Sequence, residues 1–461
     1  MSHTDPNRPR YHLTTDNWMN DPIPFWHDGA WHVYFQHNPN AAVWGDMHWG
    51  HAVSRDLIHW ETMPVALAPT PGGADQDGVW TGCVTRRPAD GKFLALYTGI
   101  PRLKDPFTQV QCVAESDDLV TWSKPRAEPI IAAPPEGYGA CFRDPQVFDG
   151  PDGSVYMVVG GELPGGEGGV AFLYRADDAS LERWTYLCPL FVGDRRTGHD
   201  FECPDFFPLG DGSAERRWVL LTSRDRTWWH TGRLTGDMRF ERDAFAPCDT
   251  GAFYAGKSCV GPDGARVLFG WLREERPVEE QAAAGWSGVL SLPRLVTVGP
   301  DGHPRFAPAP DLSALRAGSQ PYFRLSRRFT SAPAAATADD SVPLVELPLQ
   351  AEVTLRVTRP TADIETESPV FGLAFSDATG THRDIGSAPV EASGEPLDLR
   401  LFLDGSVLEV FVGGRVCWTQ RHYWNAAADR ITLCVNVRGG TLDVAAEAWN
   451  LTPEIGPSKN L

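Results

Sequence analysis

The sequence predicts an all-β protein, in which a five-bladed β-propeller is followed by a β-sandwich domain. Three observations predict this fold. Helical periodicity is nearly absent, five segments open in a similar way at intervals of blade length, and the strand pattern changes beyond residue 320. The chain has 461 residues, which is too long for one ordinary core and favours two domains.

The five similar openings are separated by steps of 59, 64, 58 and 52 residues. They are Asn20-Asp21-Pro22, Trp80-Thr81-Gly82, Arg143-Asp144-Pro145, Glu202-Cys203-Pro204 and Phe253-Tyr254-Ala255. Each opening precedes an apolar run, a turn and a second apolar run. Because equivalent positions of a repeat converge on one axis, we expect acids more than a hundred residues apart to surround one pocket.

Each repeat also carries a hairpin signal and a closing aromatic residue. Asp-Gly pairs separate the apolar runs in all five repeats, and such pairs supply the positive φ angles of hairpin turns. Their positions are Asp28-Gly29, Asp90-Gly91, Asp152-Gly153, Asp211-Gly212 and Asp263-Gly264. Trp60, Trp122 and Trp184 follow at spacings of 62 and 62, and we expect them to fill the core between adjacent blades.

The expected domain boundaries follow from composition. Residues 1–302 form the propeller, residues 303–320 form a linker rich in Pro and Ala, and residues 321–461 form the sandwich. In the last part, residues 351–357 alternate strictly between apolar and polar side chains, which is typical of a half-buried strand. Asp404-Gly405-Ser406 joins two further apolar runs as a hairpin.

Charge and cysteine usage exclude several classes of function. The net charge of −19 argues against nucleic acid or an anionic membrane as a partner, since both need a basic surface. No apolar segment resembles a signal peptide or a membrane span. Nine cysteines without a C-x-x-C pair suit a reducing compartment, so a cytoplasmic location is expected. Thirteen histidines show no zinc-site spacing, and neither metal nor organic cofactor is expected.

Three of the five openings carry an acid: Asp21, Asp144 and Glu202. Singly, each has an ordinary structural explanation as a turn residue, a surface ion pair or a backbone cap. Their occurrence together at matching repeat positions favours function. Two facing carboxylates are the usual equipment for cleaving a glycosidic bond, because one protonates the leaving oxygen while the other attacks or activates water.

These acid motifs resemble those of glycoside hydrolase family 32, the invertase and fructanase family. Residues 17–22, Asn-Trp-Met-Asn-Asp-Pro, are similar to its nucleophile box; residues 142–145 and 201–205 are similar to its Arg-Asp-Pro and Glu-Cys motifs. Order and spacing match, and residues 403–411 in the second domain are also similar to a family segment. The resemblance therefore covers nearly the whole chain.

The resemblance implies a five-bladed propeller, a sandwich and a retaining mechanism on β-fructofuranosides. It implies Asp21 as the nucleophile, Glu202 as the acid and base, and Asp144 as the stabiliser of the transition state. A retaining pair of carboxyl groups is about 5 Å apart. The residues expected to bind the substrate are Asn20, Gln36, Trp44, Trp80, Thr81, Arg143 and Tyr254, with Trp286 as a weaker candidate at the rim. A buried packing role for Trp286 is an equally good interpretation.

The chain departs from the family pattern beside the nucleophile. Ile23-Pro24 replaces the usual Asn-Gly, and Thr81 stands where the family usually has Ser. From these substitutions we hypothesise a more apolar rim, and a leaving group that is either an aglycone other than the glucose of sucrose or a linked fructose.

Several functions remain open at this point. A fructosyltransferase, in which a sugar replaces water, uses the same residues. A related furanosidase, for example one acting on a difructose anhydride, and a non-catalytic sugar-binding propeller are further alternatives. The expected partner is a small carbohydrate, with no nucleic acid and no membrane, and the expected state is a monomer or homodimer.

Overall fold

The computed structural model describes residues 5–104, 107–210, 217–331, 341–360, 368–377, 382–391, 395–424 and 430–453. Strands dominate these residues, which confirms the all-β prediction. The chain divides into two compact units. The propeller unit comprises Leu13–Cys248 and Ala252–Pro310, and the sandwich unit comprises residues 5–12, 249–251 and the described residues from 311 onward.

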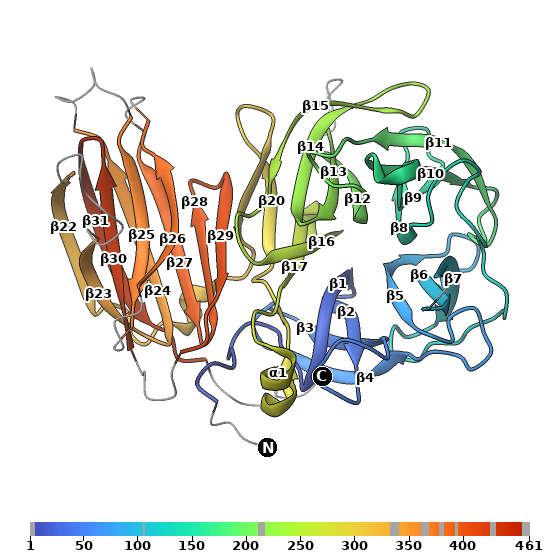
Figure 1. Ribbon diagram of the computed structural model, residues 1–461, viewed down its shortest axis with the longest axis horizontal. Helices are drawn as coiled ribbons and strands as arrows, with labels where there is room; N and C mark the ends of the chain where they lie inside the picture. Colours follow the sequence, from blue (N-terminus) through green and yellow to red (C-terminus); the bar gives the residue numbers. More distant parts are fainter. Residues whose placement is uncertain are drawn as a thin grey trace. The chain divides into compact units, whose positions relative to one another are not determined.

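The propeller unit consists of five sheets, and Figure 1 shows their first strands facing a common centre. These innermost strands are β1 (Asn17–His27), β5 (Val79–Arg86), β8 (Phe142–Asp149), β12 (Glu202–Leu209) and β16 (Phe253–Val260). The second strands are β2 (Ala30–Asn38), β6 (Phe93–Arg102), β9 (Val155–Glu162), β13 (Arg217–Arg224) and β17 (Arg266–Leu272). All five pairs are antiparallel, as the hairpin signals predict.

The outer parts of the blades are less uniform than the inner parts. The third strands are β3 (His48–Ser54), β7 (Thr108–Ser116), β10 (Gly169–Ala176), β14 (Arg226–Leu234) and β20 (Arg294–Val298). The outermost strands are β4 (Glu61–Leu67), β11 (Trp184–Val192), β15 (Phe240–Pro247) and β21 (Pro304–Pro308). In blade 2 the described sheet is three-stranded. The first part of the segment expected as a linker, residues 303–320, forms β21 and belongs to blade 5.

The ring is tied together where the last blade meets the first. After helix α1 (Val278–Ala284), the short strand β18 (Trp286–Ser287) pairs in parallel with β1, and β19 (Val289–Leu290) pairs with β17. One continuous segment thus bonds to blade 1 and to blade 5. Single 3-10 turns complete the elements: η1 (Pro164–Gly166), η2 (Pro262–Gly264) and, in the sandwich unit, η3 (Leu312–Leu315).

The expected inter-blade packing of tryptophans is confirmed. Trp122 packs edge-on against Tyr34 of blade 1, with ring centroids 5.7 Å apart. Trp60 packs against Phe269 of blade 5 at 6.5 Å, and Trp184 joins apolar side chains of blades 2 and 3. Of the Asp-Gly turns, Asp263-Gly264 has φ angles of 56° and 75°, as a primed turn requires. Asp211-Gly212 lies outside the described residues.

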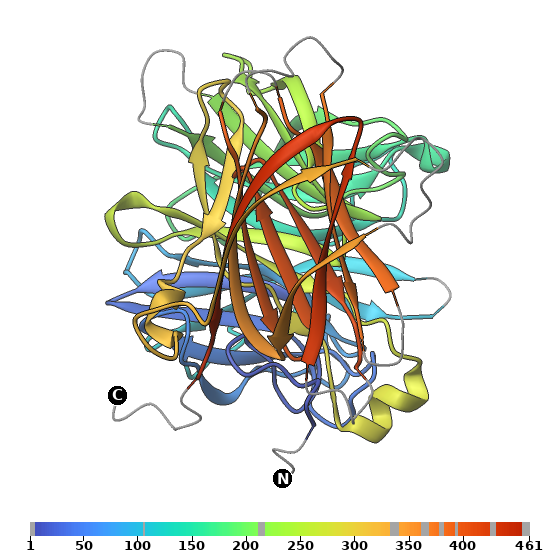
Figure 2. The same cartoon turned by 90° about the vertical axis from the view of Figure 1, so that its left-hand side faces the viewer.

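The sandwich unit consists of two antiparallel sheets whose long twisted strands, orange to red, are seen in Figure 2. One sheet has the order β22 (Phe323–Thr330), β31 (Thr441–Asn450), β24 (Gln350–Thr358), β27 (Leu397–Asp404), β28 (Val407–Val412), β29 (Val416–Arg421). The other has the order β23 (Val342–Pro348), β30 (Arg430–Arg438), β25 (Val370–Ser376), β26 (His382–Pro389). Alternating side chains of both sheets form one apolar core.

The start of the described chain belongs to the sandwich unit because Asp404 binds it. This buried carboxylate accepts hydrogen bonds from the backbone N–H groups of Arg10, Tyr11 and His12, at 2.8, 2.8 and 3.0 Å. The His12 ring lies 2.9 Å from Asp404 and 3.1 Å from Glu409, and all three side chains are fully buried. Burial acts to lower the pKa of His12, but its hydrogen bonds to the two carboxylates outweigh burial and raise it.

We expect His12→Ala to destabilise the protein by about 3 kcal/mol, because it leaves two buried carboxylates without their cation. A raised folded-state pKa means that this stabilisation is complete below the unfolded pKa and is lost as pH rises through the folded value. The loss in thermal midpoint should therefore be larger at pH 6 than at pH 9. His59→Ala is the control, since the exposed pair of His59 with Asp56 contributes little. An equal loss at both pH values would contradict the electrostatic explanation.

Candidate active site

The five similar openings form the same local structure, a break in strand register. Pairing between the first and second strands of each blade shifts at Asn20/Pro22, Val79/Gly82, Arg143/Gln146, Glu202/Asp205 and Tyr254/Lys257. Four residues within these breaks have positive φ: Asp21 (32°), Asp144 (64°), Cys203 (48°) and Ala255 (53°). A bulge of this kind re-aims side chains and is frequent beside active sites. It brings side chains of different blades into contact.

Asp21 is held by polar side chains of two blades. Its Oδ1 accepts a hydrogen bond from Asn20 Nδ2 at 3.0 Å, and its Oδ2 accepts from Gln36 Nε2 at 3.1 Å and from Thr81 Oγ1 at 2.9 Å. The pKa of Asp21 is raised to about 7, first by burial and then by the nearby charges of Asp144 and Glu202, against the hydrogen bonds from Thr81 and Asn20, which lower it. The group thus titrates near neutrality.

Asp144 lies deeper than the other two acids, with 3% of its surface exposed. Its backbone N–H donates to Thr98 Oγ1 at 2.8 Å, and its Oδ2 accepts from the backbone N–H of Cys203 at 2.8 Å. Burial raises the pKa of Asp144, while the charge of Arg143 and the Cys203 N–H act in the opposite direction. The Cys203 thiol in turn lies 3.7 Å from Asp21 Oδ2, so one residue contacts both aspartates.

Glu202 is partly exposed, with 21% of its side chain accessible to solvent. Its Oε1 accepts from Arg143 Nη2 at 2.6 Å and from Arg224 Nη1 at 3.0 Å. Its Oε2 accepts from the Tyr254 hydroxyl. Burial, followed by the charge of Glu202, raises the pKa of Tyr254 well above its usual value, so this phenol remains a donor.

The structure brings together most of the residues expected to bind substrate. Asn20, Gln36 and Thr81 hold Asp21, while Arg143 and Tyr254 hold Glu202. Trp44, 48% exposed, packs edge-on against Trp80 with ring centroids 6.1 Å apart, and Trp80 packs against Phe107 at 5.7 Å. Aromatic faces of this kind suit the apolar faces of sugar rings.

Trp286 is placed differently from its expected position at the rim. Only 1% of its surface is exposed, and the Arg276 guanidinium lies 4.3 Å from its ring centroid. Because β18 bonds to β1, the side chain is held within the packed blade junction. The idea of an apolar rim made by Ile23 is wrong for a similar reason: Ile23 is 1% exposed and belongs to the core between blades 1 and 2.

Sequence reasoning missed three charged residues of this cluster. Asp200, 1% exposed, binds Arg143 and Arg224. Lys257, also 1% exposed, donates to the backbone carbonyl of Pro204 at 3.2 Å and lies 3.5 Å from that of Pro145. No motif marks Arg224, which ends β13. Lys257 stands three residues after Tyr254, within the last break in register, and that position was the one available signal.

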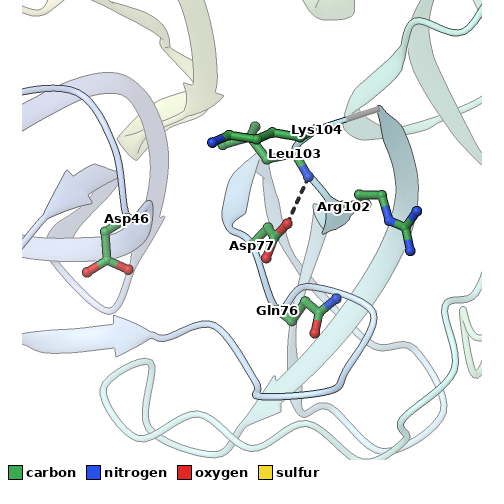
Figure 3. A pocket seen from close by; sticks show the side chains of 6 residues that line it. All are labelled: Asp46, Gln76, Asp77, Arg102, Leu103 and Lys104. Atoms are coloured by element: carbon green, nitrogen blue, oxygen red, sulfur yellow. Dashed lines mark hydrogen bonds between the residues drawn. The ribbon is translucent and has the colours of Figure 1, made fainter. Parts of the chain in front are cut away.

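A polar pocket of about 570 Å³ is formed by residues of blades 1 and 2. It is lined by Asp46, Gln76, Asp77, Arg102, Leu103 and Lys104. Figure 3 shows the Lys104 amine pointing toward the side of Asp46, whereas Arg102 points the other way. Asp77 accepts a hydrogen bond from the Leu103 backbone N–H at 2.9 Å, which fixes the loop. Donors and acceptors therefore face this pocket together.

Neither a metal-binding group of side chains nor a membrane-spanning helix is found in the described part of the chain. Among the residues that the structure describes, no group of three or more His, Cys, Asp and Glu side chains is arranged to hold a metal ion. Within the same described ranges, no helix has the length and hydropathy to cross a membrane.

Three clustered carboxylates with unequal exposure, at the converging inner strands of five blades, define a β-propeller with a glycosidase-type centre. Models of known families agree with this class. Residues 12–307 match the glycosyl hydrolases family 32 N-terminal domain, and residues 350–450 match the family 32 C-terminal domain. The chain belongs to glycoside hydrolase family 32, as its motifs predict.

Individual relatives give the same result. The chain is 34% identical to the sucrose-6-phosphate hydrolase of Escherichia coli over 62% of its own length and 61% of that protein. It is 31% identical to the raffinose invertase of Escherichia coli over 96% and 95% of the two chains. The crystal structure of fructan 1-exohydrolase IIa from Cichorium intybus superposes with a TM-score of 0.80, at 25% identity and 98% coverage of both chains.

Coverage of the relatives is uneven. The matched region spans 61% of the Escherichia coli sucrose-6-phosphate hydrolase and 54% of the rice beta-fructofuranosidase, insoluble isoenzyme 2. The chain thus covers somewhat more than half the length of these curated relatives.

We expect Asp21→Asn to stabilise the folded protein at pH 8 by about 2 kcal/mol. A carboxyl whose folded pKa lies near 7 costs stability as pH rises from its unfolded value through neutrality. Asparagine removes that charge and keeps an acceptor for the neighbouring donors. The gain in thermal midpoint should vanish near pH 4. If the variant is less stable than the wild type at pH 8, the ionised carboxylate of Asp21 does not destabilise the folded protein and the expectation is wrong.

Proposed function

We propose that this protein is a retaining glycoside hydrolase that cleaves terminal β-D-fructofuranosyl linkages, as in sucrose or fructo-oligosaccharides. One observation carries the proposal: Asp21, Asp144 and Glu202 come from three blades and form one interconnected cluster. Membership of family 32 supports the same reaction.

In the first step, Asp21 attacks the anomeric carbon of the fructosyl unit, and the bond to the leaving oxygen breaks as Glu202 donates its proton to that oxygen. Asn20, Gln36 and Thr81 fix the orientation of the nucleophile. Asp144 accepts hydrogen bonds from ring hydroxyls and opposes the positive charge that develops on the sugar.

In the second step, ionised Glu202 takes a proton from water, whose oxygen attacks the fructosyl–Asp21 ester and restores both carboxyl groups. The two steps require different protonation states at the start, a carboxylate at Asp21 and a carboxylic acid at Glu202. Different surroundings of the two groups are the usual way to achieve this.

The relatives support a small carbohydrate substrate. Their names specify sucrose-6-phosphate, raffinose and fructan as the compounds on which those proteins act. The exposed Trp44, which packs against Trp80, and the polar pocket lined by Asp46 and Lys104 offer surface for the part of the substrate beyond the fructosyl unit. We also propose that the protein is a monomer or homodimer. A cytoplasmic location is a further proposal, and the nine free cysteines support it.

We expect Asp21→Asn to lower kcat on sucrose by about four orders of magnitude, because it removes the nucleophile. Glu202→Gln should lower it by about two to four orders, with a smaller loss on an aryl fructoside, whose leaving group needs no proton. Asp118→Asn, in a turn of blade 2, is the control and should turn over normally. Normal turnover by Asp21→Asn would refute the mechanism.

The pH profile gives a second test of the nucleophile. Because Asp21 must be ionised to attack, we expect kcat/KM to fall as pH drops through about 7. Thr81→Val removes a hydrogen bond that lowers the pKa of Asp21, so this acidic limb should move to higher pH by about 0.5–1 unit. Thr81→Ser keeps the hydroxyl and should retain the wild-type profile. An unmoved limb in Thr81→Val would assign the titration to another group.

Fructosyl transfer is the principal alternative, because a sugar hydroxyl can replace water in the second step. Chromatography of the products at high sucrose concentration separates the two reactions. Glucose and fructose in equal amounts indicate hydrolysis, whereas excess glucose with longer saccharides indicates transfer. Incubation with inulin, levan and a difructose anhydride tests the other furanosides.

A further inference from the structure

The proposed mechanism leaves one buried acid of the cluster without a role. Asp200 stands two residues before Glu202, and its side chain is 2% exposed. Burial acts to raise the pKa of Asp200, but the charges of Arg143 and Arg224 outweigh burial and lower it. An ionised carboxylate therefore lies inside the wall of the site, where it needs partners to offset its desolvation.

The partners of Asp200 close a ring of alternating charges around Glu202. Asp200 Oδ2 accepts from Arg143 Nη2 at 2.6 Å, and the same nitrogen donates to Glu202 Oε1 at 2.6 Å. Asp200 Oδ1 pairs with Arg224 Nε at 3.1 Å, while Arg224 Nη1 donates to the same Oε1 at 3.0 Å. Both guanidinium groups thus meet one oxygen of Glu202.

This ring makes the two oxygens of Glu202 unequal. Guanidinium nitrogens can only donate, so Oε1 can only accept, and an acid proton has no place on it. The proton of the acid form then belongs on Oε2, the oxygen that contacts the Tyr254 hydroxyl. A fixed proton position matters because the leaving oxygen must meet the protonated oxygen at hydrogen-bond distance.

Building on the proposed function, we propose that Asp200 is a positioning residue for the acid and base step. It holds Arg143 and Arg224 on Oε1 of Glu202, directs the acid proton to Oε2, and offsets one of the two guanidinium charges beside that carboxyl group. Asp200 itself need not touch the substrate.

Several charged and titratable groups surround Glu202. The titratable groups that face it or its ring partners are Asp21, Cys141, Arg143, Asp144, His199, Asp200, Cys203, Arg224 and Tyr254. Neither Asp200 nor Arg224 contacts the nucleophile Asp21 or the stabiliser Asp144, and Arg224 reaches the proposed chemistry through Glu202 alone. They can therefore be changed in pairs without removing the nucleophile or the acid.

The experiment compares pH profiles of kcat/KM on sucrose for Asp200→Asn, Arg224→Gln and the double variant. Asp200→Asn removes the negative charge that offsets one of the two guanidinium groups, and the additional positive charge beside Glu202 favours loss of the acid proton. The alkaline limb should move to lower pH by about 1 unit, with kcat reduced about tenfold and KM changed less. Arg224→Gln removes one positive charge and should move the limb to higher pH. The double variant should return toward the wild type.

A matched control comes from the sandwich unit. Glu352 is fully buried and bound by two arginines, with Arg316 Nε at 2.8 Å and Arg400 Nε at 2.6 Å, both in the same unit. Glu352→Gln removes a carboxylate from an equivalent pair of arginines. It should lower the thermal midpoint about as much as Asp200→Asn does and leave the pH profile unmoved.

If the alkaline limbs of the two single variants move in opposite directions, the cause is a change of charge beside Glu202. A loss of stability alone would not move the two limbs in opposite directions. The proposal is overturned if the profiles of Asp200→Asn and Arg224→Gln superimpose on the wild type or move in the same direction. Failure of the proposed function gives a different result, namely normal turnover by Asp21→Asn or Glu202→Gln.

Discussion

The propeller is organised around the cost of placing three carboxyl groups close together. Burial and, after it, the charges of Asp144 and Glu202 raise the pKa of Asp21. Opposing charge comes from Arg143 beside Asp144 and Glu202, and from Lys257 on the carbonyls of Pro145 and Pro204. These cations offset part of the repulsion among the acids.

Convergence itself depends on how the blades are joined. The breaks in register turn the three acid side chains, but their separations depend on the ring being closed, and the pairing of β18 with β1 contributes to this closure. Tryptophans between blades keep neighbouring sheets at a constant spacing. Trp286, a candidate for the rim, is buried at this closure instead, where its strand pairs with β1.

The sequence was informative wherever chemistry repeats along it. Acids at matching repeat positions predicted the cluster of Asp21, Asp144 and Glu202, and Asp-Gly pairs predicted the hairpins. It was uninformative where partners come from different blades without a pattern, as with Arg224. The orientation of Ile23 also escaped prediction, because a bulge at Asp21 changes which face of the strand the following residues occupy.

The two units use the same electrostatic device for different ends. In the sandwich, Glu352 between two arginines and His12 between two acids are fully buried, so their charges can only stabilise the fold. In the propeller, Asp200 is equally buried, but the ring that it completes includes Glu202, whose side chain is 21% exposed. The two networks thus use the same kinds of residue and differ in the exposure of an acid, because the propeller network includes a carboxyl group, that of Glu202, which solvent reaches.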